Sequence, residues 1–248
     1  MTPSNAERPR LSVVIPAFDE ARRIGRTLER LDAHFHDRAG ATELVVVDDG
    51  SKDGTDGLVL EIASRSRVPV RLLRLEKNGG KGRAVRTGIL AAEGELVAFY
   101  DADGSAPPSE LDVLVAAIDQ GADVAAGSRR LDGAEVDRSL RRRIVSRSFN
   151  LLVRTIVGLD VLDSQCGIKA FRRDAARAIF ERQTLDGFAF DCEVLALADR
   201  LGLRVEHVPV RWFDGEGSKL DVARASIAML RDLARIRGLV RRAVHPRG

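Results

Sequence analysis

Short apolar runs alternate along the chain with longer segments in which apolar residues recur every three or four positions. The runs predict buried strands, and the periodic segments predict amphipathic helices. The predicted strands are Leu11–Pro16, Glu43–Val47, Val70–Leu75, Glu95–Tyr100 and Asp123–Ala126. The predicted helices between them are Ala21–Phe35, Thr55–Ser64, Gly82–Ala92 and Ser109–Gln120. This alternation is typical of an α/β fold with a Rossmann-like, mostly parallel sheet flanked by helices.

The alternation breaks after Gly127. Helical patterns dominate the second half, at Leu140–Val157, Arg173–Arg182 and Phe190–Leu201, with a polar stretch at Leu162–Phe171 and a strand-like run at Arg204–Val210. We expect a flexible N-terminus (1–10), one α/β domain (11–217) and a helical C-terminal extension (218–248). Within the domain, residues 11–130 would bind a nucleotide and residues 131–217 would carry acceptor specificity.

The extension combines one apolar face with many arginines. Its apolar stripe is Val222, Ala225, Met229, Leu233, Ile236, Val240 and Val244, and Arg224, Arg231, Arg235, Arg241 and Arg242 lie off the stripe. A basic amphipathic helix of this form can rest on a membrane surface. The other interpretation, slightly favoured, is a helix that packs its stripe on the domain or on a second subunit, so a homo-oligomer stays open.

Composition and charge narrow the function classes. The 248 residues are 44% hydrophobic and 31% charged with a formal net charge of +3, which describes a folded protein. Basic residues cluster at 138–147 and from 224 onward without interleaved aromatics, so we expect no nucleic-acid partner. Cys166 and Cys192 form no C-x-x-C pair, which favours a reducing cytoplasm. No stretch approaches ~20 apolar residues, so we expect no membrane span. A surface contact stays open, and its expected place is the cytoplasmic face of a membrane.

The strongest candidate for chemistry is the segment that follows the predicted strand Glu95–Tyr100. There Asp101 and Asp103 flank Ala102 and precede Gly104. Ligands of open α/β sheets bind beyond the carboxyl ends of the strands. Two carboxylates at such an end suit Mg²⁺ or Mn²⁺, which one or two carboxylates hold together with substrate phosphates. The alternative is an Asp-rich turn that ends the strand.

Acidic residues also follow the first two predicted strands. Glu20 comes soon after Pro16 and Ala17, and Asp48 and Asp49 end the second strand. The first strand-to-helix turn has no G-x-G-x-x-G, so a dinucleotide-binding fingerprint is absent. The segment 79–82, Gly-Gly-Lys-Gly, lacks P-loop spacing. It either lets the backbone approach a nucleotide, with Lys81 near a phosphate, or simply starts a helix.

Together these motifs resemble family 2 glycosyltransferases with the GT-A fold. The segments that carry the resemblance are Val13 to Glu20 (VVIPAFDE), Val46 to Thr55 (VVDDGSKDGT), Asn78 to Gly82 (NGGKG) and Asp101 to Gly104 (DADG). The second half resembles the narrower group of polyprenyl-phosphate, or dolichyl-phosphate, glucosyltransferases. Its matching segments are Gly127 to Arg129 (GSR), Asp163 to Lys169 (DSQCGIK), Phe188 to Glu193 (FAFDCE), and Trp212 with Gly217 to Lys219 (GSK).

The resemblance implies roles for individual residues. Base and ribose would lie among Pro16, Ala17, Glu20 and Asp49, with Asp48 and Lys81 nearby. The Asp101-Ala102-Asp103 turn would address the sugar diphosphate and a divalent cation, Mg²⁺ or Mn²⁺. Phosphate oxygens would be held by Arg129, Arg141, Arg142, Arg143 and Arg147, and Ser218 and Lys219 complete the acceptor side. Two departures matter: Ser105 stands where related mannosyltransferases often have an amide, and we see no N-terminal membrane helix.

The expected reaction is inverting transfer of a hexose, glucose from UDP-glucose as the first choice, to a polyprenyl phosphate. A phosphate acceptor is already anionic, so it needs charge management rather than a strong base. Asp163, Gln165, Asp191 and Glu193 would then orient the acceptor or bind the sugar, or would be polar structure. The alternatives are transfer from GDP-mannose, a family 2 enzyme with a soluble acceptor, and a non-catalytic nucleotide-sugar-binding module.

Overall fold

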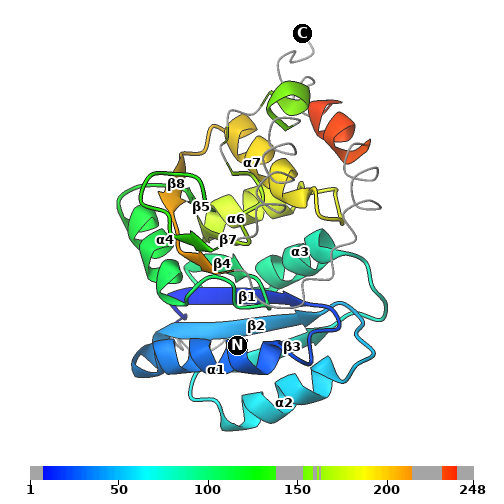
Figure 1. The fold of residues 1–248 in the computed structure, drawn as a ribbon, viewed down its shortest axis with the longest axis vertical. Coiled ribbons are helices and arrows are strands. Elements are labelled where there is room, and N and C mark those ends of the chain that lie inside the picture. Colours follow the sequence, from blue (N-terminus) through cyan, green and yellow to red (C-terminus); the bar gives the residue numbers. More distant parts are fainter. Residues whose placement is uncertain (1–7, 138–152, 159–160, 162, 214–230, 239–248) are drawn as a thin grey trace, which may run out of the picture.

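The protein is built around one seven-stranded mixed sheet, seen in a computed structural model that describes residues 8–137, 153–158, 161, 163–213 and 231–238. In order across the sheet the strands are β3 (Val70–Arg74), β2 (Thr42–Asp48), β1 (Leu11–Ala17), β4 (Leu96–Tyr100), β7 (Ile168–Arg172), β5 (Val124–Ser128) and β8 (Val205–Pro209). All neighbours are parallel except β7, which runs antiparallel to both β4 and β5. The mostly parallel sheet is therefore confirmed (Figure 1).

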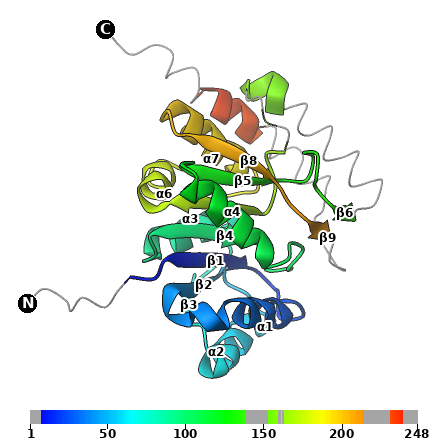
Figure 2. The same cartoon turned by 90° about the vertical axis from the view of Figure 1, so that its left-hand side faces the viewer.

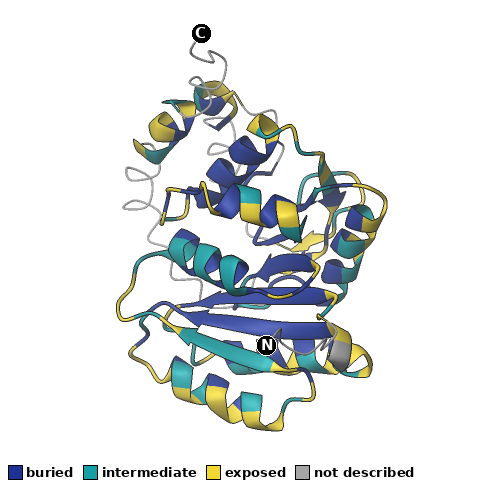
Figure 3. Ribbon diagram, turned by 180° about the vertical axis from the view of Figure 1, so that it is seen from behind, coloured by how far each residue is buried: buried dark blue, intermediate teal, exposed yellow. Residues whose placement is uncertain are grey.

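Helices cover both faces of the sheet. The helices are α1 (Ile24–Phe35), α2 (Thr55–Arg65), α3 (Lys81–Ala91), α4 (Ser109–Asp119), α6 (Arg173–Phe180) and α7 (Phe190–Arg200), with a 3-10 turn η1 (His36–Ala41) after α1. Alternate strand residues face opposite sides, so Val13 and Ile15 belong to the core that α1, α2 and α4 cover, whereas Val14 belongs to the core that α3, α6 and α7 cover. The central strands are buried on both faces apart from Arg172 at the end of β7, and the edge strands are partly exposed (Figure 3).

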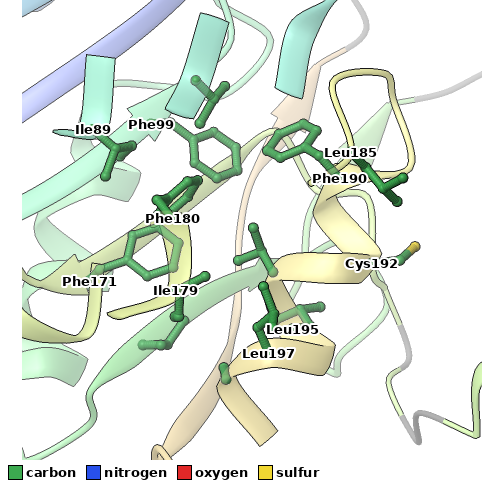
Figure 4. Packing of buried hydrophobic residues seen from close by; sticks show 14 of the residues in the cluster. Ile89, Phe99, Phe171, Ile179, Phe180, Leu185, Phe190, Cys192, Leu195 and Leu197 are labelled. Carbon is green, nitrogen blue, oxygen red and sulfur yellow. The ribbon is translucent and has the colours of Figure 1, made fainter. Parts of the chain in front are cut away.

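Aromatic rings fill the layer between the sheet and α6–α7. Phe99 of β4 lies 6.3 Å from Phe171 of β7 and 5.7 Å from Phe190 of α7, measured between ring centroids. Phe180 of α6 meets Phe171 edge-on at 5.4 Å. Figure 4 shows these four rings converging. The contacts tie α7, which carries Asp191 and Glu193, to the strand that leads into Asp101.

The expectation that Leu162–Phe171 is a polar connecting stretch is wrong. Its last part forms β7, the antiparallel strand between β4 and β5. Lys169, in the middle of the strand, is fully buried, and this charge hid the strand from a reading based on apolar runs. A short parallel pair was also missed, β6 (Val136–Asp137) with β9 (Trp212–Phe213), which lies to one side of the main sheet (Figure 2). Two residues per strand are too few to leave a periodic signal.

The order of the strands creates a switch point between β1 and β4. The chain leaves β1 through α1 on one face of the sheet and reaches β4 through α3 on the other face. In open α/β sheets the crevice at such a point, beyond the carboxyl ends of the strands, is where ligands bind. Asp101 follows β4 directly, so the candidate residues lie where the topology predicts a ligand.

None of the described helices combines the length and apolarity needed to cross a bilayer. Most of the predicted helix Leu140–Val157 lies outside the described residues, and its last part, 153–157, is helical. Of the C-terminal extension the structure describes 231–238, which is also helical. Leu233 and Ile236, both on the predicted apolar stripe, are fully buried and belong to the core beside α6 and α7. At these two positions the stripe packs against the domain.

Candidate active site

Backbone hydrogen bonds bring the strand ends of the two halves together at one edge of the sheet. The N–H of Asp49, after β2, binds the carbonyl of Ala17 at the end of β1 at 2.8 Å. The N–H of Asp101, after β4, binds the carbonyl of Gly167 just before β7 at 3.1 Å. Because β7 is antiparallel, its beginning lies at the same edge as the end of β4. The motif at 163–169 therefore lies beside the Asp101–Asp103 turn, as a shared site requires.

Hydrogen bonds within the turn and from neighbouring elements hold the Asp101-Ala102-Asp103 turn. A carboxylate oxygen of Asp103 accepts the N–H of Ser105 at 3.0 Å, and the Thr27 hydroxyl donates to the carbonyl of Ala102 at 2.8 Å. Gly104 allows the chain to turn, with a left-handed φ of 63° and its N–H on the Asp101 carbonyl at 3.2 Å. Ser105 is buried, and its carbonyl accepts the N–H of Phe213 at 2.8 Å. The turn is thus fixed from α1 and from β9.

Lys81, the first residue of α3, forms an ion pair with Asp101. Its Nζ lies 2.6 Å from Asp101 Oδ1, and the two side chains are 19% and 23% exposed. Burial raises the pKa of Asp101, and the negative charge of Asp103 adds to this increase. The nearby Lys81 ammonium lowers the pKa of Asp101 but does not cancel the increase. For Lys81, burial acts to lower the pKa, but Asp101 and Asp191 outweigh it and raise the pKa. The predicted phosphate-binding lysine thus lies at the predicted metal-binding carboxylate.

Asp49 fixes the glycine loop that precedes Lys81. Its two carboxylate oxygens accept the N–H groups of Gly79 at 2.9 Å and Gly80 at 2.7 Å. Gly80 has φ of 103°, and a Cβ there would lie 2.4 Å from the carbonyl oxygen of Asp186, so only glycine fits. Burial raises the pKa of Asp49 in spite of these bonds. Asp49 therefore couples the end of β2 to the start of α3.

The remaining acidic groups of the first half lie around the same edge. Glu20 forms an ion pair with Arg23, whose Nε lies 2.6 Å from it. Burial raises the pKa of Glu20, and the charges of Asp103 and Asp101 raise it further, which places Glu20 within the electrostatic reach of the turn. Asp48 is fully buried and accepts the N–H of Ser51 at 3.0 Å. Pro16 and Ala17 are buried at the end of β1.

Arg129, after β5, is held by Asp163. Its Nε and Nη2 lie 2.7 Å and 2.8 Å from the two carboxylate oxygens, and Nη2 also donates to the carbonyl of Gln165 at 3.1 Å. Its guanidinium lies 5.0 Å from the Trp212 ring centroid. Burial would raise the pKa of Asp163, but Arg129 outweighs it and lowers the pKa to about 2. A phosphate-binding role for Arg129 stays a prediction, and three of its donor contacts already go to protein oxygens.

A second buried ion pair was not foreseen. Lys169 Nζ lies 2.5 Å from Asp191 Oδ1 and donates to the carbonyls of Cys166 at 3.0 Å and Ser164 at 3.3 Å. The two side chains are 0% and 5% exposed. The signal in the sequence was a lone lysine within the otherwise largely apolar run 168–171. Lys169 thereby holds the turn that ends in Gly167, beside Asp101.

Glu193 holds the loop before α7. It is fully buried and accepts the N–H of Thr184 at 3.0 Å, the hydroxyl of Thr184 at 2.7 Å and the N–H of Leu185 at 2.8 Å. The next part of this loop touches α3, because the backbone carbonyl of Asp186 accepts the N–H of Arg83 at 3.2 Å. Gln165 reaches the same loop, with Nε2 3.4 Å from the Phe188 carbonyl. These contacts give Glu193 a structural role in positioning the loop.

Comparison with known proteins identifies the family. Residues 12–180 match the model of glycosyl transferase family 2. The chain belongs to glycosyl transferase family 2. It is 35% identical over 240 residues to a dolichyl-phosphate beta-glucosyltransferase of Dictyostelium discoideum, covering 92% of this chain and 73% of that protein. It is 32% identical to the human protein of the same name, covering 92% and 74%. The predicted family and enzyme class are confirmed.

A solved structure shows the same fold. Glucosyl-3-phosphoglycerate synthase from Mycobacterium tuberculosis, in complex with Mn²⁺, UDP and glucosyl-3-phosphoglycerate, matches with a TM-score of 0.69. The match covers 98% of this chain and 82% of that chain at 24% identity. The GT-A-like fold of this family 2 enzyme is therefore confirmed.

The carboxylates at the end of β4 fit a hard divalent cation that takes its other ligands from substrate and water. Among the described residues no group of three or more His, Cys, Asp or Glu side chains could form a metal cage by itself. Asp101 and Asp103 offer carboxylate oxygens at a strand end, which suits a cation that completes its shell with substrate phosphates and water. The predicted phosphate and acceptor residues Arg141, Arg143, Arg147, Ser218 and Lys219 lie outside the described residues.

Proposed function

We propose that this family 2 glycosyltransferase transfers glucose from UDP-glucose to a polyprenyl phosphate of the dolichyl type. Support comes from relatives with that activity in their names, which match about nine-tenths of the chain at 32% to 37% identity. The donor follows the same reasoning, since the structurally similar synthase was solved with UDP-glucose and Mn²⁺. The site residues assigned below are part of this proposal.

The observation that carries the proposal is the state of the buried carboxylates in the second half. Asp163 is bound by Arg129, Asp191 by Lys169, and Glu193 by Thr184 and Leu185. A hydroxyl acceptor needs a general base, and in the described part of this half each buried carboxylate already has its own donors. A phosphate acceptor is anionic near neutral pH and needs no such base. The site therefore suits a phosphate acceptor.

The reaction is a single displacement. An acceptor phosphate oxygen forms a bond to the anomeric carbon while the bond from that carbon to the donor's diphosphate breaks, and the electron pair leaves on the UDP oxygen. Attack opposite the leaving group inverts the centre, so an α-linked donor gives a β-linked lipid phosphate sugar. Asp49 and the glycine loop position the nucleotide, and Asp101 and Asp103 face its diphosphate. A divalent cation held by Asp101 and Asp103 would offset the diphosphate charge.

A lipid acceptor places the enzyme at a membrane surface, and we propose peripheral association on the cytoplasmic side. The two cysteines are free and buried, which is compatible with a reducing compartment. The basic clusters at 138–147 and from 224 onward supply positive charge for anionic headgroups.

The test is a donor and acceptor panel. Purified protein is incubated with Mg²⁺, polyprenyl phosphate, and either labelled UDP-glucose or labelled GDP-mannose, and the label is measured in the organic extract. We expect lipid-linked glucose from UDP-glucose, and none from the variant Asp103→Asn at wild-type folded yield. Lipid-linked mannose alone would assign the other donor. Label absent from the lipid with both donors would contradict a lipid acceptor.

A further inference from the structure

The position at Asp101 that a divalent cation needs is already held by a positive charge. Lys81 Nζ lies 2.6 Å from Asp101 Oδ1. Gly167 lies against the other oxygen, because a Cβ there would be 1.9 Å from Oδ2. Oδ1 itself is buried, with the ammonium against it. The two oxygens of one carboxylate lie close together, so a divalent cation at ~2.1 Å from either of them would lie within a few ångströms of Nζ, where the two charges repel strongly in a partly buried site.

A second carboxylate is available to Lys81 nearby. Lys81 also lies in the field of Asp191, which acts with Asp101 to stabilise its charged form. Asp191 is bound by Lys169 at 2.5 Å, so positive and negative groups alternate in the order Lys169, Asp191, Lys81, Asp101. The lysine side chain is a flexible four-carbon stem with a point charge at its end. Its ammonium can therefore leave Asp101 without being stranded away from negative charge.

We propose that Lys81 is the resident counter-ion of Asp101, and that it leaves this carboxylate when the donor and its divalent cation bind. The inference rests on the proposed cation site and adds an exchange of positive charge to it. Before binding, Lys81 neutralises a carboxylate that would otherwise stand partly buried beside Asp103. After binding, its ammonium is free to bind a diphosphate oxygen of the donor. Lys81 is thus a positioning residue for the empty site and a ligand of the nucleoside diphosphate in the filled one.

Two measurements on purified full-length protein test the exchange. Mn²⁺ binding is followed by the electron paramagnetic resonance of the free ion, with and without UDP, in wild type, Lys81→Met and the matched control Lys77→Met, which removes an exposed lysine. Because the competing ammonium is gone, we expect Lys81→Met to bind Mn²⁺ alone about tenfold more tightly than wild type does. In the presence of Mn²⁺, the variant should bind UDP about tenfold more weakly than wild type. The control should change both by less than about twofold.

Thermal unfolding, measured with and without Mn²⁺, tests the exchange independently of binding. Without metal, Lys81→Met should melt at a lower temperature than wild type, because Asp101 loses its partner. Saturating Mn²⁺ should then raise the melting temperature of the variant more than that of wild type. Equal increases in the melting temperatures of variant and wild type would overturn the proposed exchange. So would an affinity for Mn²⁺ that is lower in Lys81→Met than in wild type.

A crystal structure with Mn²⁺ and UDP places the lysine directly. We expect Nζ to lie beyond about 4 Å from Asp101 Oδ1, the limit of an ion pair. Nζ still on Oδ1 with Mn²⁺ bound to Asp101 would overturn the exchange and leave the proposed function intact. If wild type and Lys81→Met both fail to bind Mn²⁺ in the presence of UDP, the cation site itself is wrong and the inference falls with it.

Discussion

Gly167 lies against the carboxylate of Asp101 so closely that an added Cβ would be 1.9 Å from Oδ2 and 2.4 Å from Cγ. The carbonyl of Gly167 also accepts the N–H of Asp101 at 3.1 Å. The second half of the chain thus sets the position of the first carboxylate of the turn through one glycine just before β7.

We predict that Gly167→Ala inactivates the enzyme. The methyl group must displace the Asp101 carboxylate or the turn before β7, and a displacement of ~1 Å at a reacting site costs about 100-fold in turnover. The measurement is sugar transfer at saturating donor, together with the melting temperature. Gly57→Ala, in helix α2 with open space at its Cβ, is the matched control and should keep full activity. Wild-type turnover in Gly167→Ala would show that the contact does not position Asp101.

The ion pair between Arg129 and Asp163 should contribute strongly to stability. Its side chains are 8% and 1% exposed, so Asp163→Asn leaves a buried guanidinium without its charge partner. Loss of one partner of a buried pair costs about 3–5 kcal/mol in the free energy of unfolding. Urea denaturation measures this value. In the control Glu95→Gln, which breaks the exposed pair with Arg10, the cost should stay below about 1 kcal/mol.

The same pair predicts a dependence on pH. The pKa of Asp163 is lowered to about 2 in the folded protein, so its contribution to stability is complete above its unfolded pKa of ~3.9 and is lost as the pH falls through the folded value. We expect the gap in unfolding free energy between wild type and Asp163→Asn to shrink by about 2 kcal/mol between about pH 5 and about pH 2. A gap that stays constant over this range would show that Asp163 has an ordinary pKa.

Asp101 and Lys169 illustrate which parts of the fold and the site can be predicted from the sequence and which cannot. The βα alternation and the acidic ends of β1, β2 and β4 were predicted correctly, because buried parallel strands are long apolar runs and their charged residues fall just beyond the carboxyl ends. The position of Asp101 just beyond the end of β4 followed from that rule.

Lys169 marks where the prediction failed. Strand β7 contains a charge that is acceptable in the interior only because Asp191, from a helix 22 positions later in the chain, binds it. A partner so distant in sequence leaves no periodic signal, so the antiparallel strand and the buried pair were both missed. The bonds of Asp49 to Gly79 and Gly80 were hidden for the same reason, since they depend on how two loops meet in space.

The C-terminal stripe gives the last prediction. Leu233 and Ile236 are fully buried in the core, whereas Arg235 between them is 72% exposed at its side chain. Leu233→Ala should therefore lower the free energy of unfolding by about 2–5 kcal/mol through lost burial and the cavity left behind. Arg235→Ala should change it by less than about 0.5 kcal/mol, as expected of an exposed side chain.

Flotation with anionic liposomes separates packing from membrane contact. If Leu233 faces the core, binding of the folded Leu233→Ala variant should equal that of wild type, and a selective loss of binding would place this residue at the lipid surface.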